Sequence, residues 1–276
     1  MTMAPQDFFP HLADWVAALD DVFPGKQVKP YFAQFEVGHL LSLAVLGGSS
    51  ILLNLRLLGV GLTDETPREM HRSLSVWVHI GLFGILLTGV LIGSANAERL
   101  YTSGAFSAKM VGLLAGVILT YGVALPASRN DGTLSSASRV AAVVGLATFA
   151  LAIWVFLAAK LSNPGLWHVI FAAGLIVAYA TRGLTRIVYL SGAALMIVAQ
   201  QIMTHVVFKA DDYANLDPTN IAFAWGFVAW ILGAATLHAV ASGRGPHGGA
   251  FIKTMAFAAI LVWVMTAAAG RWLAFA

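Results

Sequence analysis

The stretch that decides the fold is FEVGHLLSLAVLGGSSILLNLRLLG, residues 35–59. It is almost wholly apolar, and a helix of about 20 such residues crosses the hydrocarbon core of a bilayer. Yet it keeps an imidazole, His39, a few residues inside its start, one turn after the carboxyl group of Glu36. We therefore expect a membrane-spanning helix, and the reason for that imidazole is the functional question.

The composition of the whole chain indicates a polytopic membrane protein. Its 276 residues are 59% hydrophobic and 11% charged, with a mean hydropathy of +0.79, whereas soluble domains are about 25% charged. The chain has no cysteine, which excludes disulfides, thiolate metal sites and cysteine nucleophiles. The net charge is +3, and the basic residues are scattered at span ends rather than clustered, so no nucleic-acid partner is expected.

We predict an all-α bundle of about eight transmembrane helices, preceded by an interfacial helix. Residues 1–34 lack the pattern of a signal peptide, and their apolar residues recur at helical spacing against acidic ones, which is typical of an amphipathic segment lying on a membrane. The fifth and sixth predicted spans are short and separated only by TRGLTR, residues 181–186, so seven spans is the alternative. The predicted spans are 36–60, 73–95, 108–127, 138–160, 166–183, 186–208, 219–242 and 251–273.

A weak internal repeat organises these spans. RSLSVWVHIGLFGILLTGVLIG (72–93) and RIVYLSGAALMIVAQQIMTHVV (186–207) both open at an arginine and lead into a polar loop. We interpret residues 35–160 and 161–276 as two tandem four-helix repeats. Lys and Arg are more frequent in the loops after spans one, three, five and seven. The positive-inside rule then predicts a protein of the bacterial inner membrane with both termini in the periplasm.

Histidine is the only ionisable residue type well inside the predicted spans. The thirteen acidic residues lie outside them, except Glu36 at the mouth of the first, and the Lys and Arg residues lie at or near span ends. Ionisable side chains inside a membrane are costly and indicate function by default. At ~1.5 Å per residue, three of the five fall roughly 10 Å outside the midplane and two fall roughly 7–10 Å inside it. The outer three are His39, His168 and His205, and the inner two are His79 and His238.

Two layers of imidazoles suit one or two b-type haems, each held by two axial histidines. We expect His39 with His205 or His168 at the outer haem, and His79 with His238 at the inner one. Glu36 would orient His39, as outer partners orient metal-bound histidines. Lys109 outside and Arg72 inside would bind haem propionates. The alternatives are neutral imidazoles hydrogen-bonded between helices and cations that reach to lipid headgroups.

The opening stretch, with WVHIGLFGILLTGVLIGSA (77–95) and FSAKMVGLLAGV (106–117), resembles a family of uncharacterised bacterial membrane proteins. In that family Glu-x-x-His opens the first span, Leu-Arg-Leu-Leu-Gly closes it, and F-x-x-K-M follows the second. The family is distantly similar to the copper-resistance D (CopD) membrane proteins and to cytochrome b561-like bundles. The resemblance implies a helical membrane bundle, with haem b or copper as the metal. It covers about the first 120 residues.

Electron transfer by b-type haem is the predicted function, and the chain would be the membrane subunit of an oxidoreductase if it serves an enzyme. Its partners would be the lipid bilayer, a periplasmic redox protein or a quinone, and an oligomer is compatible with the sequence. The first alternative is CopD-like copper handling, for which Met196, Met203 and His205 are candidate soft ligands. The second is a metal-free subunit that anchors a redox partner. An ion-coupled transporter ranks last, because no carboxylate lies at the midplane.

Overall fold

The computed structural model describes residues 3–60, 62, 64–159, 165–209, 211–241 and 249–273. Every regular element in these ranges is a helix, which confirms the all-α class. A membrane favours this outcome, because a helix satisfies its backbone polar groups within one segment. The described helices long and apolar enough to cross a membrane are Gly25–Leu57, Pro67–Ser94, Gly104–Arg129, Ser136–Ala158, Gly183–Val207, Ala214–His238 and Ala250–Trp272.

The predicted fifth span corresponds to a helix that is shorter than these. It corresponds to α10 (Gly165–Ala180), which has 16 residues in the described part of the chain. The other predicted spans agree with observed helices to within a few residues. The exception is that some observed helices begin one or two turns earlier than the hydropathy pattern indicates. The chain is therefore a multi-pass helical membrane protein.

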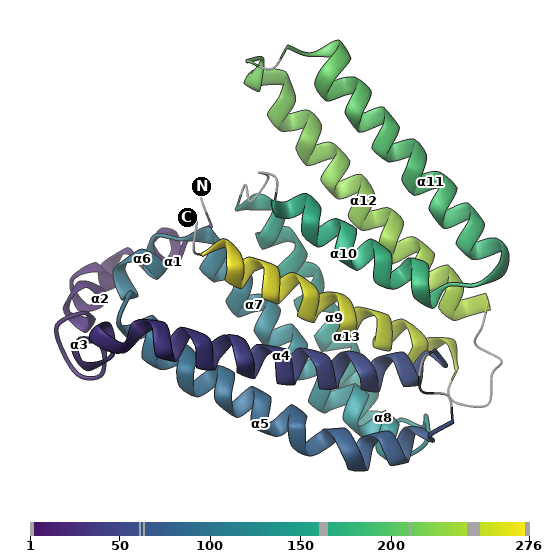
Figure 1. The fold of residues 1–276 in the computed structure, drawn as a ribbon, viewed down its shortest axis with the longest axis horizontal. Coiled ribbons are helices and arrows are strands. Elements are labelled where there is room, and N and C mark those ends of the chain that lie inside the picture. The colour runs from purple at the N-terminus through teal and green to yellow at the C-terminus, as the bar shows by residue number, and fades with distance from the viewer. Residues whose placement is uncertain are drawn as a thin grey trace.

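The N-terminal segment folds into short helices: α1 (Pro5–Phe8), α2 (Ala13–Leu19) and α3 (Gly25–Val28). The first two pack against α6 (Ala97–Tyr101), and α3 packs against the helix Pro67–Ser94, at one end of the bundle. We call this the terminal end because both chain termini lie there (Figure 1). Val16 is buried against Ala97 and Tyr101. The Tyr101 hydroxyl donates to the carbonyl of Phe9 at 2.6 Å. These contacts hold the predicted amphipathic segment across the ends of the long helices.

The core of the bundle brings the first and last helices together. The helix α4 (Phe32–Leu57) is antiparallel to α5 (Pro67–Ser94), and α7 (Gly104–Leu119) is antiparallel to α9 (Ser136–Ala158). The helix α13 (Ala250–Trp272) returns to pack on α7, α4 and α9 (Figure 1). Its approach to α7 depends on small residues, because a Cβ at Gly112 would lie 2.5 Å from Thr266 Oγ1 and one at Gly116 would lie 3.0 Å from Trp263.

A π-helical turn, Thr120–Ala124, links α7 to α8 (Leu125–Arg129) within the third span. Such turns widen a helix by one residue and often occur at sites with a special packing requirement. Here the requirement is a hydrogen bond between two helices. Trp263 Nε1 of α13 donates to the fully buried hydroxyl of Thr120 at 3.0 Å. The turn therefore joins the third span to the last helix.

The remaining helices form a less covered group beside this core. The helix α11 (Gly183–Ile202), which continues through a π turn, Met203–Val207, lies against α12 (Tyr213–Ala241). Trp230 Nε1 of α12 donates to the carbonyl of Tyr189 at 3.0 Å. The Tyr189 hydroxyl in turn donates to the carbonyl of Gly174 in α10 at 2.9 Å. In Figure 1, α11 lies away from α4 and α5, whereas α10 and α12 reach α13.

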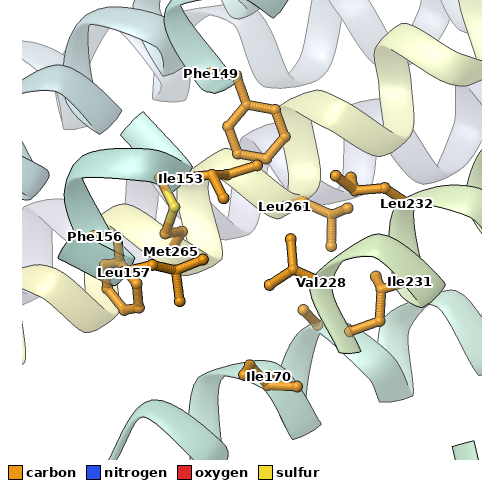
Figure 2. A pocket seen from close by; sticks show the side chains of 11 residues that line it. Phe149, Ile153, Phe156, Leu157, Ile170, Val228, Ile231, Leu232, Leu261 and Met265 are labelled. Atoms are coloured by element: carbon orange, nitrogen blue, oxygen red, sulfur yellow. The ribbon is translucent and has the colours of Figure 1, made fainter. Parts of the chain in front are cut away.

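A half-open pocket lies at the junction of α9, α10, α12 and α13. Figure 2 shows the side chains around it, which are aliphatic or aromatic except for the thioether of Met265. Among the described residues, the side chains that line it are apolar. This described lining offers apolar contact, whereas polar groups gather at the terminal end.

Candidate functional site

The imidazole of His39 is buried, with 8% of its surface exposed, and it is held by a threonine of the neighbouring helix. Its Nδ1 lies 2.8 Å from Oγ1 of Thr88 in α5. The Thr88 hydroxyl donates its proton to the carbonyl of Gly84, one turn earlier in the same helix. Since a hydroxyl has one hydrogen, Oγ1 accepts from Nδ1. The network therefore assigns the proton of neutral His39 to Nδ1 and leaves a lone pair on Nε2.

The lone pair on Nε2 faces an ammonium group. Nζ of Lys109 in α7 lies 3.2 Å from Nε2 of His39, and an ammonium can only donate. The stem of Lys109 passes α13 at Gly270, where an added Cβ would lie 3.5 Å from the lysine Cε. Four helices, α4, α5, α7 and α13, thus meet at one polar group of three residues: His39, Thr88 and Lys109. We call this group the His39 site.

The charge of Lys109 has no carboxylate next to it in the described ranges. The ion pairs found there join Lys29 to Asp20 and Arg68 to Asp131, both at exposed positions. A charge removed from water is costly unless it is paired and hydrogen-bonded. The ammonium of Lys109 has three hydrogens, and the imidazole nitrogen can accept one of them. Lys109 therefore keeps the capacity to donate to a further acceptor.

The His39 site lies at the terminal end of the bundle, close to its lateral surface. At ~1.5 Å per residue, His39 is about 10 Å along α4 from Phe32, and Lys109 is about 8 Å along α7 from Gly104. Thr88 and Lys109 are half-buried rather than enclosed. The site is therefore only partly enclosed by the bundle, one to two helical turns from the ends of α4 and α7.

Sequence reasoning missed two residues of this site. Thr88 was not considered, although it is a single hydroxyl residue in the apolar run LLTGV, at the depth of His39 on the antiparallel partner. Gly89 is the second, because a Cβ there would lie 3.4 Å from Cε1 of His39. The available signal was the equal depth of His39 and Thr88, but it requires knowing that α4 and α5 are neighbours.

The predicted role of Glu36 is not what the structure shows. Its side chain is exposed, and the contacts of the His39 ring in the described residues are to Thr88 and Lys109. One helical turn separates Glu36 from His39 in sequence, but the glutamate faces outward. The orienting partner of His39 is therefore Thr88, from another helix.

The two histidines predicted for an inner layer occupy different surroundings. His79 is exposed on α5, with Nδ1 at the backbone oxygen of Ser75 and its ring edge-to-face with Tyr121 at 5.3 Å. His238 is buried near the end of α12, with its ring 6.3 Å from that of Phe257. Cations surround this second ring closely enough to act on its charge: Lys253, Arg182 and Arg186. Arg72 is exposed near the start of α5.

Two predicted pairs of haem ligands, His39 with His205 and His79 with His238, lie on helices that are not packed side by side. His205 is exposed in the π turn that follows α11, and α11 packs on α12 and α10 rather than on α4 (Figure 1). The side chain of His168 lies outside the described residues. Likewise, α5 carries His79 and packs on α4 and α8, whereas α12 packs on α10, α11 and α13. The described side chains therefore do not fit two bis-histidine haems.

A larger metal site is also not found in the described ranges, where no group of three or more His, Cys, Asp or Glu side chains is placed to hold an ion. What the structure does bring together is one imidazole, one ammonium and one hydroxyl. This arrangement defines a helical membrane protein with a polar site where four helices meet, and this site can both donate and accept hydrogen bonds.

The family of this chain follows from the comparison with known families. The model of a family of unknown function (DUF6644) matches residues 14–167, more than half of the chain, and the chain belongs to that family. The match runs from α2 to the start of α10 and so includes His39, Thr88 and Lys109. Neither the curated proteins nor the solved structures gave a match.

Proposed function

We propose that this protein binds the head group of a lipid-soluble quinone at the His39 site and thereby takes part in membrane electron transfer. The observation that carries the proposal is the contact of 3.2 Å between Lys109 Nζ and His39 Nε2. A quinone carbonyl needs a hydrogen-bond donor, and the hydroxyl of the reduced quinol needs an acceptor. The ammonium keeps hydrogens that can be donated to the carbonyl, and the imidazole lone pair can accept from the quinol hydroxyl once the ammonium turns to the ligand.

The fixed orientation of His39 supports this assignment. The hydrogen bond from Nδ1 to Thr88 sets the tautomer, so Nε2 is an acceptor before any ligand arrives. The positive charge of Lys109 would stabilise the electron-rich, reduced forms of a bound quinone. The partly enclosed site suits a ligand that arrives through the bilayer. In this proposal the electrons are exchanged with a redox protein, and the chain supplies binding and a proton acceptor.

The binding step can be measured with the purified protein in lipid nanodiscs. Decyl-ubiquinone is titrated while the quenching of tryptophan fluorescence is followed. Lys109→Met removes a charge-assisted hydrogen bond and is expected to weaken binding about tenfold or more. Lys253→Met is the matched control, because Lys253 is also buried but lies near the start of α13, at the opposite end of the bundle.

Two outcomes decide this experiment. Weaker binding by Lys109→Met and His39→Ala, with Lys253→Met close to wild type, supports the proposal. Equal affinities for Lys109→Met and Lys253→Met, in samples that remain folded and monodisperse, contradict it. Binding of anionic lipid in place of the quinone would also contradict it, and the same titration with phosphatidylglycerol-rich nanodiscs reveals that case as competition.

The number, the repeat and the orientation of the spans are part of the same proposal. We infer eight spans, arranged as two tandem four-helix repeats over residues 35–160 and 161–276, in a bacterial inner membrane with both termini periplasmic. A periplasmic redox protein would then reach the terminal end, where the His39 site lies. A C-terminal alkaline phosphatase fusion should be active, and an inactive fusion with an active cytoplasmic reporter would reverse this orientation.

The binding of haem b or of copper stays a prediction, and metal analysis tests it. One observation favours a metal at His39: a ring whose Nδ1–H is tied to a neighbour presents Nε2 as metal-bound histidines do. A reduced-minus-oxidised visible spectrum with a pyridine haemochrome assay counts haems, and copper is measured on the same sample. A metal-free protein that binds quinone would agree with the proposal, and one that binds neither would leave only a subunit that anchors a partner.

A further inference from the structure

The outward side of α11 carries polar side chains within the membrane span. Ser191, Gln201 and His205 are all exposed, and their spacing of ten and four residues places them on one helix face. Ala194 and Val198 lie between them on the same face and are also exposed. We call these five residues the α11 stripe. The span that contains it, Gly183–Val207, has the lowest buried share among the candidate spans that the structure describes.

The lipid-like face of α5 shows what an ordinary exposed surface of this protein looks like. Between residues 76 and 90 its exposed side chains are large and apolar except for His79, which contacts the Ser75 carbonyl and the Tyr121 ring. These apolar side chains are Val76, Trp77, Ile80, Phe83, Leu86, Leu87 and Val90. The α11 stripe differs in carrying Ser191, Gln201 and His205. Large apolar side chains remain exposed within and beside it, at Val198, Ile187 and Leu195.

The polar groups of the stripe are only partly satisfied by the chain itself. Gln201 Nε2 donates to Gln200 Oε1 at 2.7 Å, and Gln200 Nε2 donates across to Asn220 Oδ1 of α12. Within the described ranges, this leaves the carboxamide oxygen of Gln201 and the ring nitrogens of His205 without a hydrogen bond. Polar groups left unpaired in hydrocarbon are costly. Lipid acyl chains cannot satisfy them, but another helix can.

We propose that the α11 stripe is the contact between two copies of this chain. A two-fold axis along the membrane normal brings the two α11 helices together in parallel, so each residue meets its own copy at the same depth. A carboxamide has both donors and acceptors, so Gln201 is complementary to Gln201 of a second copy. Ser191 and Ala194 are small enough for the two backbones to approach closely. A second copy thus supplies matching groups at every polar position of the stripe.

The absence of native cysteine allows a direct test in membranes. Val198→Cys places one thiol in the middle of the stripe, and Val90→Cys places one on the lipid-like face of α5. The two positions are comparably exposed, at 55% and 67%. After copper–phenanthroline oxidation at low expression, we expect Val198→Cys to run largely as a disulfide-linked dimer and Val90→Cys to stay monomeric.

A second variant separates specific packing from chance collision. Adding Gln201→Leu to Val198→Cys should lower the dimer yield several-fold if the polar contact holds the two copies together. An unchanged yield would overturn the proposed role of Gln201. Equal dimer yields from Val198→Cys and Val90→Cys would overturn the interface, as would a cross-linked product whose mass shows a different protein. Neither result depends on whether a quinone binds at the His39 site.

Discussion

Nζ of Lys109 lies 3.2 Å from Nε2 of His39, although the two residues are 70 positions apart in the chain. A lysine one or two turns inside a membrane helix usually extends its ammonium toward the headgroups. Here it turns into the bundle instead, along Gly270 of α13, and meets a buried imidazole. This inward direction distinguishes the His39 site from an ordinary interfacial cation and motivates the predictions that follow.

Thr88 should control the protonation site of His39. Thr88→Val removes the acceptor for Nδ1–H, whereas Thr88→Ser keeps it. The loss of one hydrogen bond, worth about 1 kcal/mol, predicts roughly fivefold weaker quinone binding for valine and little change for serine. Solid-state NMR of ¹⁵N-histidine should show the Nδ1–H tautomer of His39 in the wild type and in Thr88→Ser. An unchanged tautomer in Thr88→Val would contradict the assigned network.

Gly89 should matter for the ligand rather than for the fold. In Gly89→Ala the added Cβ would lie 3.4 Å from Cε1 of His39, at van der Waals contact, and would restrict the movement of the ring. We expect weaker quinone binding with a melting temperature close to that of the wild type. Gly47→Ala is the control, because no atom lies within 4 Å of its added Cβ. Equal quinone affinities for the two variants would show that the ring has room to move.

Gly81 should matter for the fold rather than for the ligand. An added Cβ would lie 2.6 Å from the backbone nitrogen of Leu46, at the contact of α5 with α4. Backbone atoms cannot yield as a flexible side chain can, so Gly81→Ala should lower the free energy of unfolding by about 1–3 kcal/mol. Gly47→Ala on α4 should be neutral or slightly stabilising by comparison. Reversible unfolding in mixed micelles compares them, and equal stabilities would contradict the close helix approach.

Trp263 and Thr120 should be coupled energetically. Their hydrogen bond of 3.0 Å is buried and joins α13 to the π turn of the third span. Trp263→Phe leaves the Thr120 hydroxyl without this donor and should cost about 1–2 kcal/mol of stability. A double-mutant cycle with Thr120→Val isolates the pair, because the second change should cost much less once the first is present. Additive effects would mean that the bond contributes nothing.

The sequence located the spans well because hydropathy reports directly on them. It also singled out His39, since ionisable side chains inside apolar runs are rare, and it named Lys109 as a cation near the end of a span. It could not show that Thr88 orients His39, because a lone threonine in an apolar helix usually bonds only to its own backbone. The choice between Glu36 and Thr88 depends on which helix lies beside α4 and at what register.

The lateral pairing of the histidines does not follow from the sequence for the same reason. Depth along the membrane normal follows from position in a span, and it placed His39 and His205 in one layer. The lateral position of a residue in the bundle does not follow from its depth. The place beside α4 is taken by α5 and by α13, whose buried tryptophan packs on the glycines of α7, and α11 lies beyond α12. Two histidines at equal depth can therefore lie on opposite sides of the bundle.

The central claim is that Lys109 donates to a quinone carbonyl beside His39, and infrared spectroscopy tests it most directly. Quinone labelled with ¹³C at one carbonyl is bound to the protein in nanodiscs, and the difference spectrum against quinone in lipid alone is recorded. We predict that the labelled carbonyl band moves to lower wavenumber in the wild type and in Lys253→Met, and that it returns to the lipid position in Lys109→Met. A carbonyl band at the same position in all three proteins would contradict the account.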